Sequence, residues 1–256
     1  MTQDENFHVY SLFSGSKGNG IYISCGTGSI LIDAGYPART VRDAMNRIGA
    51  SSAALNGIFV THEHTDHIRG VELLSRTLDV HMTQGCAPYI KCSEIHRHVH
   101  TPVFSVQTGD MEVSSFVTPH DSHESVGYIV RMPGHTVGVA TDLGYMPADI
   151  LERLCMCDTV VLESNHDEDM LMNGRYPYSL KQRILSDRGH LSNRACAACV
   201  RELAQNGVRN ILLAHLSEEN NTPELAFRTS DAVLEQIPQC RTRLAVADRT
   251  APTRLV

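Results

Sequence analysis

The chain has 256 residues, of which 42% are hydrophobic and 20% charged, and its formal net charge is −7 at pH 7. This length suits one α/β domain, and the acidic balance argues against unspecific binding of nucleic acid over the whole surface. No apolar run approaches the ~18 residues of a membrane span, and the polar residues 1–6 do not resemble a secretory signal. No linker or low-complexity tract interrupts the chain. We therefore expect a single cytoplasmic domain over residues 1–256.

Eight cysteines are present, and without a secretory signal they do not predict a disulfide framework. Cys196 and Cys199 form the only pair at Cys-x-x-Cys spacing, inside a helical pattern and without a second pair that would complete a four-cysteine zinc site. We interpret both as small core residues, with redox activity or metal binding as the alternative.

The chain begins with a pattern of hairpin-linked strands over residues 7–13, 21–25 and 29–35. The glycine-rich loop at 14–20 lacks the Gly-Lys-Ser/Thr ending of a nucleotide-binding loop, although its backbone amides could line a site. Asp33 closes an apolar strand, an unusual place for a charge unless a nearby group uses it. Apolar residues at helical spacing then predict a helix over residues 38–48.

Three imidazoles and an aspartate follow the apolar run 57–60, namely His62, His64, Asp66 and His67. A buried strand that ends in such a cluster holds ligands at its tip, where sites form in α/β sheets. Imidazole suits zinc, manganese or iron, and a carboxylate adds charge and can bridge two ions. Burying these groups without a metal would cost ~1–3 kcal/mol for each unpaired polar atom. The stretch therefore predicts a two-metal hydrolase site, followed by a helix over about 67–77.

Further polar residues follow the later predicted strands. Strand patterns cover residues 108–117, 125–132, 136–141, 158–163 and 210–214, and they are followed or closed by His120, His123, Asp142, Glu163 and His215. The four histidines at 81, 96, 98 and 100 fit no ligand pattern, and an exposed edge or loop explains them as well.

The region 170–210 carries seven Lys or Arg against two acidic residues, so a local groove for a polyanion and an ordinary solvated face both remain open. Ser192 or Asn193 can cap a long helix that runs to about residue 205, and the start of such a helix is a natural phosphate site. A helix to about residue 237 and a strand over 243–247 close the chain.

The motif His-x-His-x-Asp-His after a strand resembles the signature of the metallo-β-lactamase fold. Three further sequence segments resemble the YycJ/WalJ group within this fold family. They are Glu163-Ser164-Asn165-His166-Asp167, Tyr176-Pro177, and Gly189-His190-Leu191-Ser192-Asn193. Members of that group are DNA exonucleases. The resemblance implies an α/β metallo-β-lactamase-like αββα sandwich, with two mixed β-sheets flanked by helices. No insertion is large enough for the nucleic-acid-clamping domain of the RNA-processing relatives.

The resemblance also implies a ligand set for two divalent metal ions, Zn2+ or Mn2+ with Fe possible. One ion would be held by His62, His64 and His120, the other by Asp66, His67 and His215, and Asp142 would bridge them. His123 competes with His120 for the histidine position, and otherwise it would support the ligands or face the substrate. Asp33 would support the ligands by hydrogen bonding. The true β-lactamases carry cysteine at the position of Asp142, so antibiotic hydrolysis is disfavoured and the phosphodiesterase and thioesterase branches are favoured.

The leading hypothesis is a metal-dependent phosphodiesterase, by resemblance a 5′-to-3′ exonuclease that acts on DNA with a metal-bridging hydroxide oriented by Asp66. His190, oriented by Glu163, resembles the acid pair that protonates the leaving group in tRNA-processing relatives. The residues expected to hold phosphates are Lys181, Arg183, Ser192 and Asn193. Two alternatives remain: a hydrolase of a small phosphodiester or of a glyoxalase II-like thioester, and a metal-bound sensor without turnover. Neither oligomeric state nor the metal bound in the cell follows from the sequence.

Overall fold

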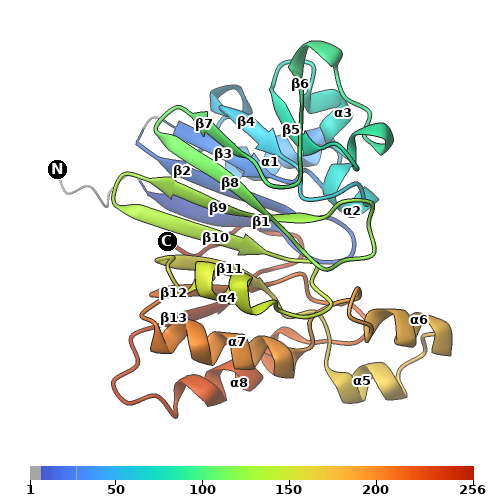
Figure 1. The fold of residues 1–256 in the computed structure, drawn as a ribbon, viewed down its shortest axis with the longest axis vertical. Coiled ribbons are helices and arrows are strands. Elements are labelled where there is room, and N and C mark those ends of the chain that lie inside the picture. Colours follow the sequence, from blue (N-terminus) through green and yellow to red (C-terminus); the bar gives the residue numbers. More distant parts are fainter. Residues whose placement is uncertain (1–6, 27) are drawn as a thin grey trace. The chain divides into compact units, whose positions relative to one another are not determined.

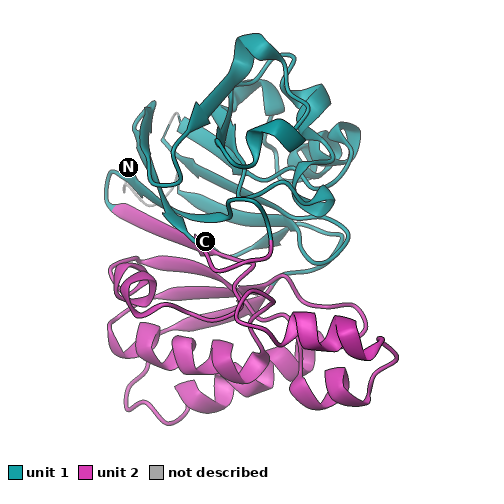
Figure 2. Ribbon diagram, turned by 45° about the vertical axis from the view of Figure 1, so that its right-hand side comes forward, with its two compact units in different colours: residues 1–117, 122–134, 247–256 teal, residues 118–121, 135–246 magenta. Residues whose placement is uncertain are grey.

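The computed structural model describes residues 7–26 and 28–256. The polar residues 1–6 and Thr27, in the predicted turn between the second and third strands, lie outside the described residues. The described chain divides into two compact units (Figure 2): unit 1 comprises residues up to 117, 122–134 and 247–256, and unit 2 comprises 118–121 and 135–246. The expectation of a single domain remains a prediction.

Unit 1 is rich in strands. They are β1 (His8–Phe13), β2 (Gly20–Cys25), β3 (Gly28–Ile32), β4 (Gly57–Phe59), β5 (Val80–Thr83), β6 (Arg97–His100), β7 (Ser105–Thr108), β8 (Met111–Val117), β9 (Val126–Met132) and β14 (Thr253–Arg254). Its helices are α1 (Ala38–Arg47), α2 (Thr65–Ile68) and α3 (Val71–Leu74), with short 3-10 helices η2 (Ser52–Ala54), η3 (Ala87–Tyr89) and η4 (Glu94–His96).

Unit 2 alternates strands and helices. Its strands are β10 (His135–Ala140), β11 (Thr159–Glu163), β12 (Asn210–Ala214) and β13 (Arg243–Val246). Its helices are α4 (Ala148–Leu154), α5 (Glu168–Asn173), α6 (Tyr178–Ile184), α7 (Asn193–Gln205) and α8 (Pro223–Leu234).

Within residues 7–26 and 28–256, the strands form two sheets of seven strands each (Figure 1), in the orders β14-β1-β2-β3-β4-β5-β6 and β13-β12-β11-β10-β9-β8-β7. Both sheets are mixed. β3 to β6 pair in parallel after the antiparallel β1-β2-β3, and β10 to β13 pair in parallel while β7-β8-β9 are antiparallel. The predicted fold class, α/β with two mixed sheets flanked by helices, is confirmed.

Apolar burial explains why these segments pair as they do. Every residue of β3, β4 and β11 is buried, as expected for parallel strands covered on both faces. In unit 1, α1 packs Val41 and Met45 into a cluster with Leu31 and Ile58. Within the same unit, the buried Tyr128 of β9 donates a hydrogen bond to the Val60 carbonyl, which joins β9 to the end of β4.

The parallel strands also determine where polar residues gather. Carboxyl ends of parallel strands meet at one edge of a sheet, so residues that follow them become neighbours. In unit 1, Asp33 follows β3 and Val60 follows β4. In unit 2, Asp142 and Ser164 follow β10 and β11, and His215 follows β12.

The helix predicted over about 67–77 is wrong, because two short helices, α2 and α3, stand there with Gly70 between them. The Gly70 amide donates to the Ala34 carbonyl, and a Cβ at this position would lie 2.5 Å from the Tyr36 carbonyl oxygen. The close approach to the end of the β3 segment therefore interrupts the helix.

The long helix that the sequence places before residue 205 is confirmed as α7, with Ser192 as its N-cap. Cys196 and Cys199 are both buried on this helix, and burial raises the pKa of both thiols. None of the eight cysteines, all within the described residues, forms a disulfide. In the described part of the chain, no helix is long and apolar enough to cross a membrane.

The four histidines without a ligand pattern lie on and beside β5 and the edge strand β6. The His81 ring is stacked between Phe59, at a centroid distance of 4.5 Å, and His98, at 4.8 Å. Its Nδ1 lies 3.0 Å from His100 Nε2. His81 is thus a buried stacking residue. Burial, with a smaller contribution from the neighbouring histidines, lowers its pKa from 6.5 to about 4.

Acid should destabilise the protein partly through His81. Its folded-state pKa lies below the unfolded value, so the stability gained by keeping the ring neutral is present above pH 6.5 and is lost as the pH falls toward 4. The substitution His81→Phe keeps a flat ring against Phe59 and removes the titration. We expect the thermal midpoint of the wild type to fall more steeply than that of the variant between pH 6.5 and 4.5, measured by circular dichroism. Parallel curves for the two proteins would contradict this assignment.

Candidate metal centre

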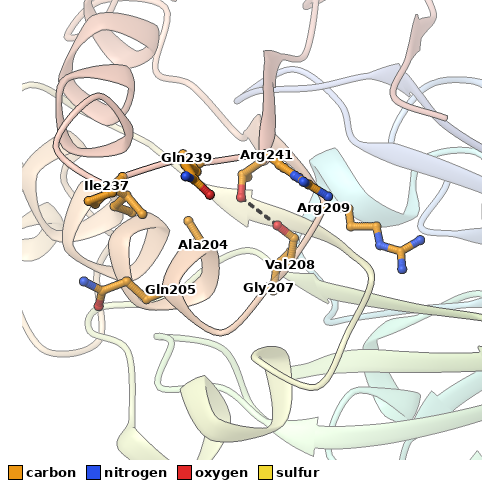
Figure 3. A pocket seen from close by; sticks show the side chains of 11 residues that line it. Ala204, Gln205, Gly207, Val208, Arg209, Ile237, Gln239 and Arg241 are labelled. Atoms are coloured by element: carbon orange, nitrogen blue, oxygen red, sulfur yellow. Dashed lines mark hydrogen bonds between the residues drawn. The ribbon is translucent and has the colours of Figure 1, made fainter.

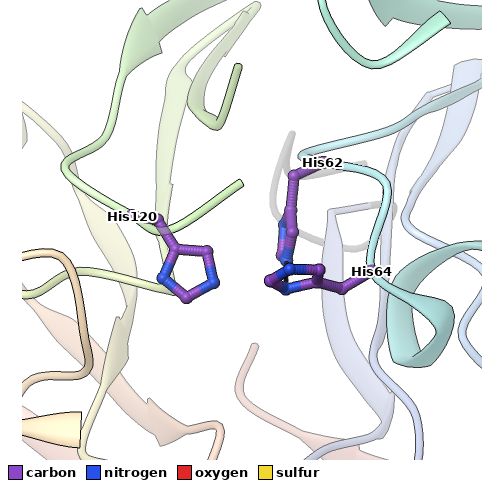
Figure 4. Close-up of side chains that lie close together, drawn as sticks. All are labelled: His62, His64 and His120. Atoms are coloured by element: carbon purple, nitrogen blue, oxygen red, sulfur yellow. Dashed lines mark hydrogen bonds between the residues drawn. The ribbon is translucent and has the colours of Figure 1, made fainter. Parts of the chain in front are cut away.

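The loop after β4 gathers three imidazoles in unit 1. His62 Nε2 lies 3.0 Å from His64 Nδ1, and the rings of His62 and His67 have centroids 4.1 Å apart. His62 and His67 are fully buried. Figure 4 draws His62 and His64 on this loop and also labels His120, a residue of unit 2.

Asp33 fixes the orientation of this loop. One of its carboxylate oxygens accepts from the Thr61 amide at 2.8 Å, and the other accepts from the Thr61 hydroxyl at 2.8 Å. The second oxygen also lies 2.7 Å from His67 Nδ1. A carboxylate on Nδ1 directs the other ring nitrogen outward, as in metal sites where such partners orient the ligand. Asp33 therefore orients His67, a residue that the sequence analysis expects to be a metal ligand.

Asp66 and Asn19 face the outward nitrogen of His67. Asp66 Oδ2 lies 3.4 Å from His67 Nε2, and Asn19 Nδ2 lies 3.1 Å from it. The Asn19 amide group also donates to Asp66 Oδ2 at 3.2 Å. The approach depends on Gly35, where a Cβ would lie 1.7 Å from the Asp66 carbonyl oxygen. The glycine-rich loop thus contributes the Asn19 side chain to this cluster.

Unit 2 gathers a second cluster at the carboxyl ends of its parallel strands: Asp142, Glu163, His190 and His215. Each offers one atom, and these four atoms lie within 4.8 Å of one another. Asp142, Glu163 and His215 are buried, and His190 is partly exposed.

Glu163 organises this second cluster. Its Oε1 lies 2.8 Å from both His190 Nδ1 and His215 Nδ1, and its Oε2 accepts from the amides of Leu143 and Leu191. Burial alone would raise the pKa of Glu163, but the charges and hydrogen bonds of His190 and His215 outweigh burial and hold it well below its usual range. The ionised carboxylate leaves Nε2 of both rings directed away from Glu163.

His120 is held in a similar way. The Gly189 carbonyl can only accept, so it places the proton on His120 Nδ1 at 3.1 Å. His120 Nε2 then lies 3.7 Å from Asp142 Oδ1. Burial lowers the pKa of His120, the charge of Asp142 opposes this, and the net shift is downward. The neutral ring is the form that binds a metal.

Three residues of these clusters adopt left-handed backbone conformations that non-glycine residues rarely use. The φ angles are 61° at Asp33, 61° at Asp142 and 58° at His215. Each residue closely follows a central strand, and backbone strain of this kind is concentrated at functional sites. The strain marks the same strand ends in both units as candidates for function.

One pocket of unit 2 lies away from these clusters (Figure 3). It is lined by residues around 204–209 and 237–242, where the Thr242 hydroxyl donates to the Val208 carbonyl at 2.7 Å. These residues precede β12 and β13, so the pocket is at the amino ends of the strands. The clusters above, at the carboxyl ends, carry the donor groups.

The comparisons with known proteins agree with this geometry. Residues 29–216 match the model of the β-lactamase superfamily domain. The chain belongs to the β-lactamase superfamily. It is 34% identical over 236 residues to the exodeoxyribonuclease YycJ of Bacillus anthracis, which covers 90% of this chain and 89% of the relative. It is 33% identical over 232 residues to the exodeoxyribonuclease WalJ of Streptococcus pneumoniae, with 87% and 86% covered.

Among solved structures, the metallo-β-lactamase fold protein YhfI of Bacillus subtilis resembles this chain with a TM-score of 0.73. The two share 14% identity over 98% of this chain and all of that one, so this likeness concerns the fold. The predicted resemblance to the metallo-β-lactamase fold and its YycJ/WalJ group is thereby confirmed.

A superfamily member of this kind implies divalent metal ions, and the donors of this chain fit them. Imidazole nitrogens and carboxylate oxygens are suitable ligands for zinc, manganese and iron. His62, His67, His120 and His215 each have one ring nitrogen held by a protein group, namely Thr61, Asp33, Gly189 and Glu163. Such partners set the tautomer and leave the other nitrogen for the metal.

The remaining expected site residue of unit 1, His123, has a side chain that is 53% exposed. Its Nδ1 lies 2.8 Å from Glu63 Oε1, and its ring stacks on Tyr89. Glu63 and Tyr89 were missed by sequence reasoning, because their relation to His123 links positions far apart in the chain. The Cys86 thiol, which donates to Glu63 Oε2, was missed for the same reason.

The four residues expected to hold phosphates differ in exposure. Arg183 is 60% exposed in its side chain and pairs with Asp121. Lys181 Nζ donates to the carbonyls of Met172 and Gly174, which ties α6 to the end of α5.

The two residues at the start of α7 are buried. Ser192 donates to Glu168 at 2.8 Å and caps α7. Asn193 is 1% exposed, and its side chain is held by Ser164 and Asn221. In this arrangement the Asn193 side chain organises the turn before α7 inside unit 2, and its expected role in holding phosphate stays a prediction.

Replacing Glu163 by glutamine should weaken metal binding without unfolding the chain. The amide cannot accept from His190, His215 and two backbone amides at once, so both rings lose their fixed tautomer. We expect affinity for Zn2+ to fall about 10- to 100-fold, measured by competition with a chromophoric chelator. The matched control is Glu168→Gln, which removes a carboxylate that contacts Ser192 and Arg194. Equal zinc affinity in Glu163→Gln and wild type would show that the carboxylate does not position a ligand.

Proposed function

We propose that this chain is a metal-dependent phosphodiesterase that degrades DNA as an exonuclease from the 5′ end. One observation carries the proposal. The buried Asp142, Glu163 and His215 and the partly exposed His190 gather in a chain one third identical, over nearly its whole length, to relatives named exodeoxyribonucleases. A cytoplasmic location, where DNA is accessible, is part of the same proposal.

The proposed ligand set draws on both clusters. His62, His64 and His120 would hold one divalent cation, and Asp66, His67 and His215 would hold the other. Asp142, a buried carboxylate, would complete the set. When bound, two such cations, Zn2+ or Mn2+ with Fe as a further candidate, would lower the pKa of a water and stabilise negative charge on the phosphate.

The side chains around the ligands have distinct tasks. Asp66 orients the attacking water with its carboxylate. His190 protonates the departing alkoxide from Nε2, because Glu163 occupies its Nδ1 at 2.8 Å. A general acid in this position supplies the proton that a poor alkoxide leaving group needs.

Of the two basic residues expected to hold phosphates, Arg183 is the better candidate. Its exposed guanidinium fits a phosphate, whereas Lys181 orders the turn between α5 and α6 through two carbonyl oxygens. Ser192 and Asn193 shape the start of α7 beside His190. Among the four residues expected to hold phosphates, Arg183 is therefore the main phosphate contact.

The decisive experiment is digestion of DNA labelled at either end, single and double stranded, with Mn2+ or Zn2+. The wild type should release short products from the 5′ end, and Asp142→Ala should lose this activity because both proposed metal positions lose a carboxylate. The control is Asp149→Ala, an exposed aspartate of α4 in the same unit. If metal-loaded wild type cleaves no DNA under either metal, a hydrolase of small phosphodiesters or thioesters becomes the better assignment.

Arg183→Gln should raise KM for DNA and make it less sensitive to salt. Loss of one phosphate contact reduces the slope of log affinity against log salt by about 1. Because Arg183 pairs with Asp121, next to His120, metal content is measured in parallel to exclude loss of the ions. Arg241→Gln, an exposed arginine of unit 2, is the control. A salt slope unchanged from wild type would remove Arg183 from the DNA path.

A further inference from the structure

An exposed aromatic pair is attached to the ligand loop of unit 1. Tyr89, the last residue of η3, is 53% exposed. Its ring stacks on that of His123, with centroids 3.8 Å apart and an interplanar angle of 25°. The His123 side chain is itself 53% exposed. Two stacked flat rings in water are a surface suited to a third flat ring.

Glu63 holds this pair in place. Its Oε1 accepts from the His123 backbone amide at 3.0 Å and lies 2.8 Å from His123 Nδ1. Its Oε2 accepts from the Cys86 thiol at 3.0 Å. The Glu63 side chain is only 9% exposed. The rotamer of His123 is thus set before any ligand arrives, which reduces the entropy cost of binding.

The segment that carries Tyr89 is connected to His123 by a second set of contacts. Thr83 Oγ1 donates to the Glu124 carbonyl at 3.0 Å, and the Gly85 amide donates to Glu124 Oε2 at 2.9 Å. A Cβ at Gly85 would lie 2.5 Å from the Glu124 Cβ, so glycine permits this approach. The segment before η3 and the residue after His123 are therefore held together.

The chain position of Glu63 connects the aromatic pair to the candidate metal centre. Glu63 stands between His62 and His64, so the residue that positions His123 belongs to the same loop as two proposed ligands. A flat group that stacks on Tyr89 would therefore be connected to that loop through His123 and Glu63. Among groups that are joined to a phosphodiester, the nucleobase has this shape.

We propose that Tyr89, backed by His123, is the base-stacking seat of this enzyme and takes the flat face of one nucleobase of the strand being cleaved. The inference rests on the proposed nuclease function and names a substrate contact for it. Stacking accepts every base, since each base has a π face. A seat of this kind suits an exonuclease that must advance through any sequence.

The test compares Tyr89→Ala with Tyr89→Phe and Tyr89→Trp on a DNA oligonucleotide. We expect Tyr89→Ala to raise KM about 5- to 50-fold with little change in kcat, and both aromatic variants to stay near wild type. Ile95→Ala, an 86% exposed residue of η4 in the same unit, is the surface control. Thermal unfolding and metal content show whether Tyr89→Ala keeps its fold and its ions.

Abasic substrates separate the seat from the nuclease activity itself. Oligonucleotides that lack one base, at successive positions from the cleaved end, are given to wild type and to Tyr89→Ala. When the missing base is the one that stacks on Tyr89, the wild type and Tyr89→Ala should have the same KM. For the other abasic substrates, the wild type should keep the lower KM. If wild type cleaves DNA but Tyr89→Ala has the same KM at every position, the seat is refuted and the nuclease assignment stands. If wild type cleaves no DNA, both proposals fall.

Discussion

Each buried imidazole of the candidate centre is held through one ring nitrogen by a group of the protein, and the geometry of both units depends on these contacts. An imidazole that is buried with an unsatisfied nitrogen costs free energy, and a ring that can rotate presents the wrong nitrogen to a ligand. Asp33 satisfies Nδ1 of His67 and fixes the orientation of its ring. Glu163 does the same for both His190 and His215. Glu163 is completely buried, and its charge is stabilised chiefly by the same rings and by two backbone amides. The carboxylate therefore fixes the orientation of the rings, and the rings stabilise the buried charge of the carboxylate.

The backbone contributes a second constraint at the same strand ends. Asp33, Asp142 and His215 have φ near +60°, which costs non-glycine residues on the order of 1–3 kcal/mol each. The strands that carry them are fully or almost fully buried, and their packing outweighs this cost. A chain that turns so sharply places a side chain directly at the edge of the sheet. Strain, burial and polar chemistry coincide at these positions.

Local patterns in the sequence reveal much of this arrangement, and its limits are physical. His62, His64, Asp66 and His67 follow one buried strand, so spacing alone brings them together. Asp142 and His215 end other apolar runs and could be recognised in the same way. Family resemblance was needed to relate these clusters to one another as a ligand set.

Contacts between distant positions escape such patterns. The cap sequence at Asn193 indicates the start of a helix, but it does not reveal that the Asn193 side chain contacts Asn221, 28 residues away. Glu63 meets His123 across 60 residues. Likewise, apolar spacing predicted one helix after His67, and only the approach of Gly70 to the Ala34 carbonyl shows why it breaks.

A net charge of −7 restricts how such a protein can hold DNA. General attraction between a basic surface and phosphates is not available to it, because the average field repels a polyanion. Under the proposed function, affinity must arise from a few local contacts: the cations at the carboxylate and imidazole clusters, the exposed Arg183, and stacking on Tyr89. Of these, stacking is the contact least affected by salt, since it involves no counterion release. An acidic exonuclease with an aromatic seat would therefore retain part of its affinity for DNA at salt concentrations where a protein that relies on phosphate contacts dissociates.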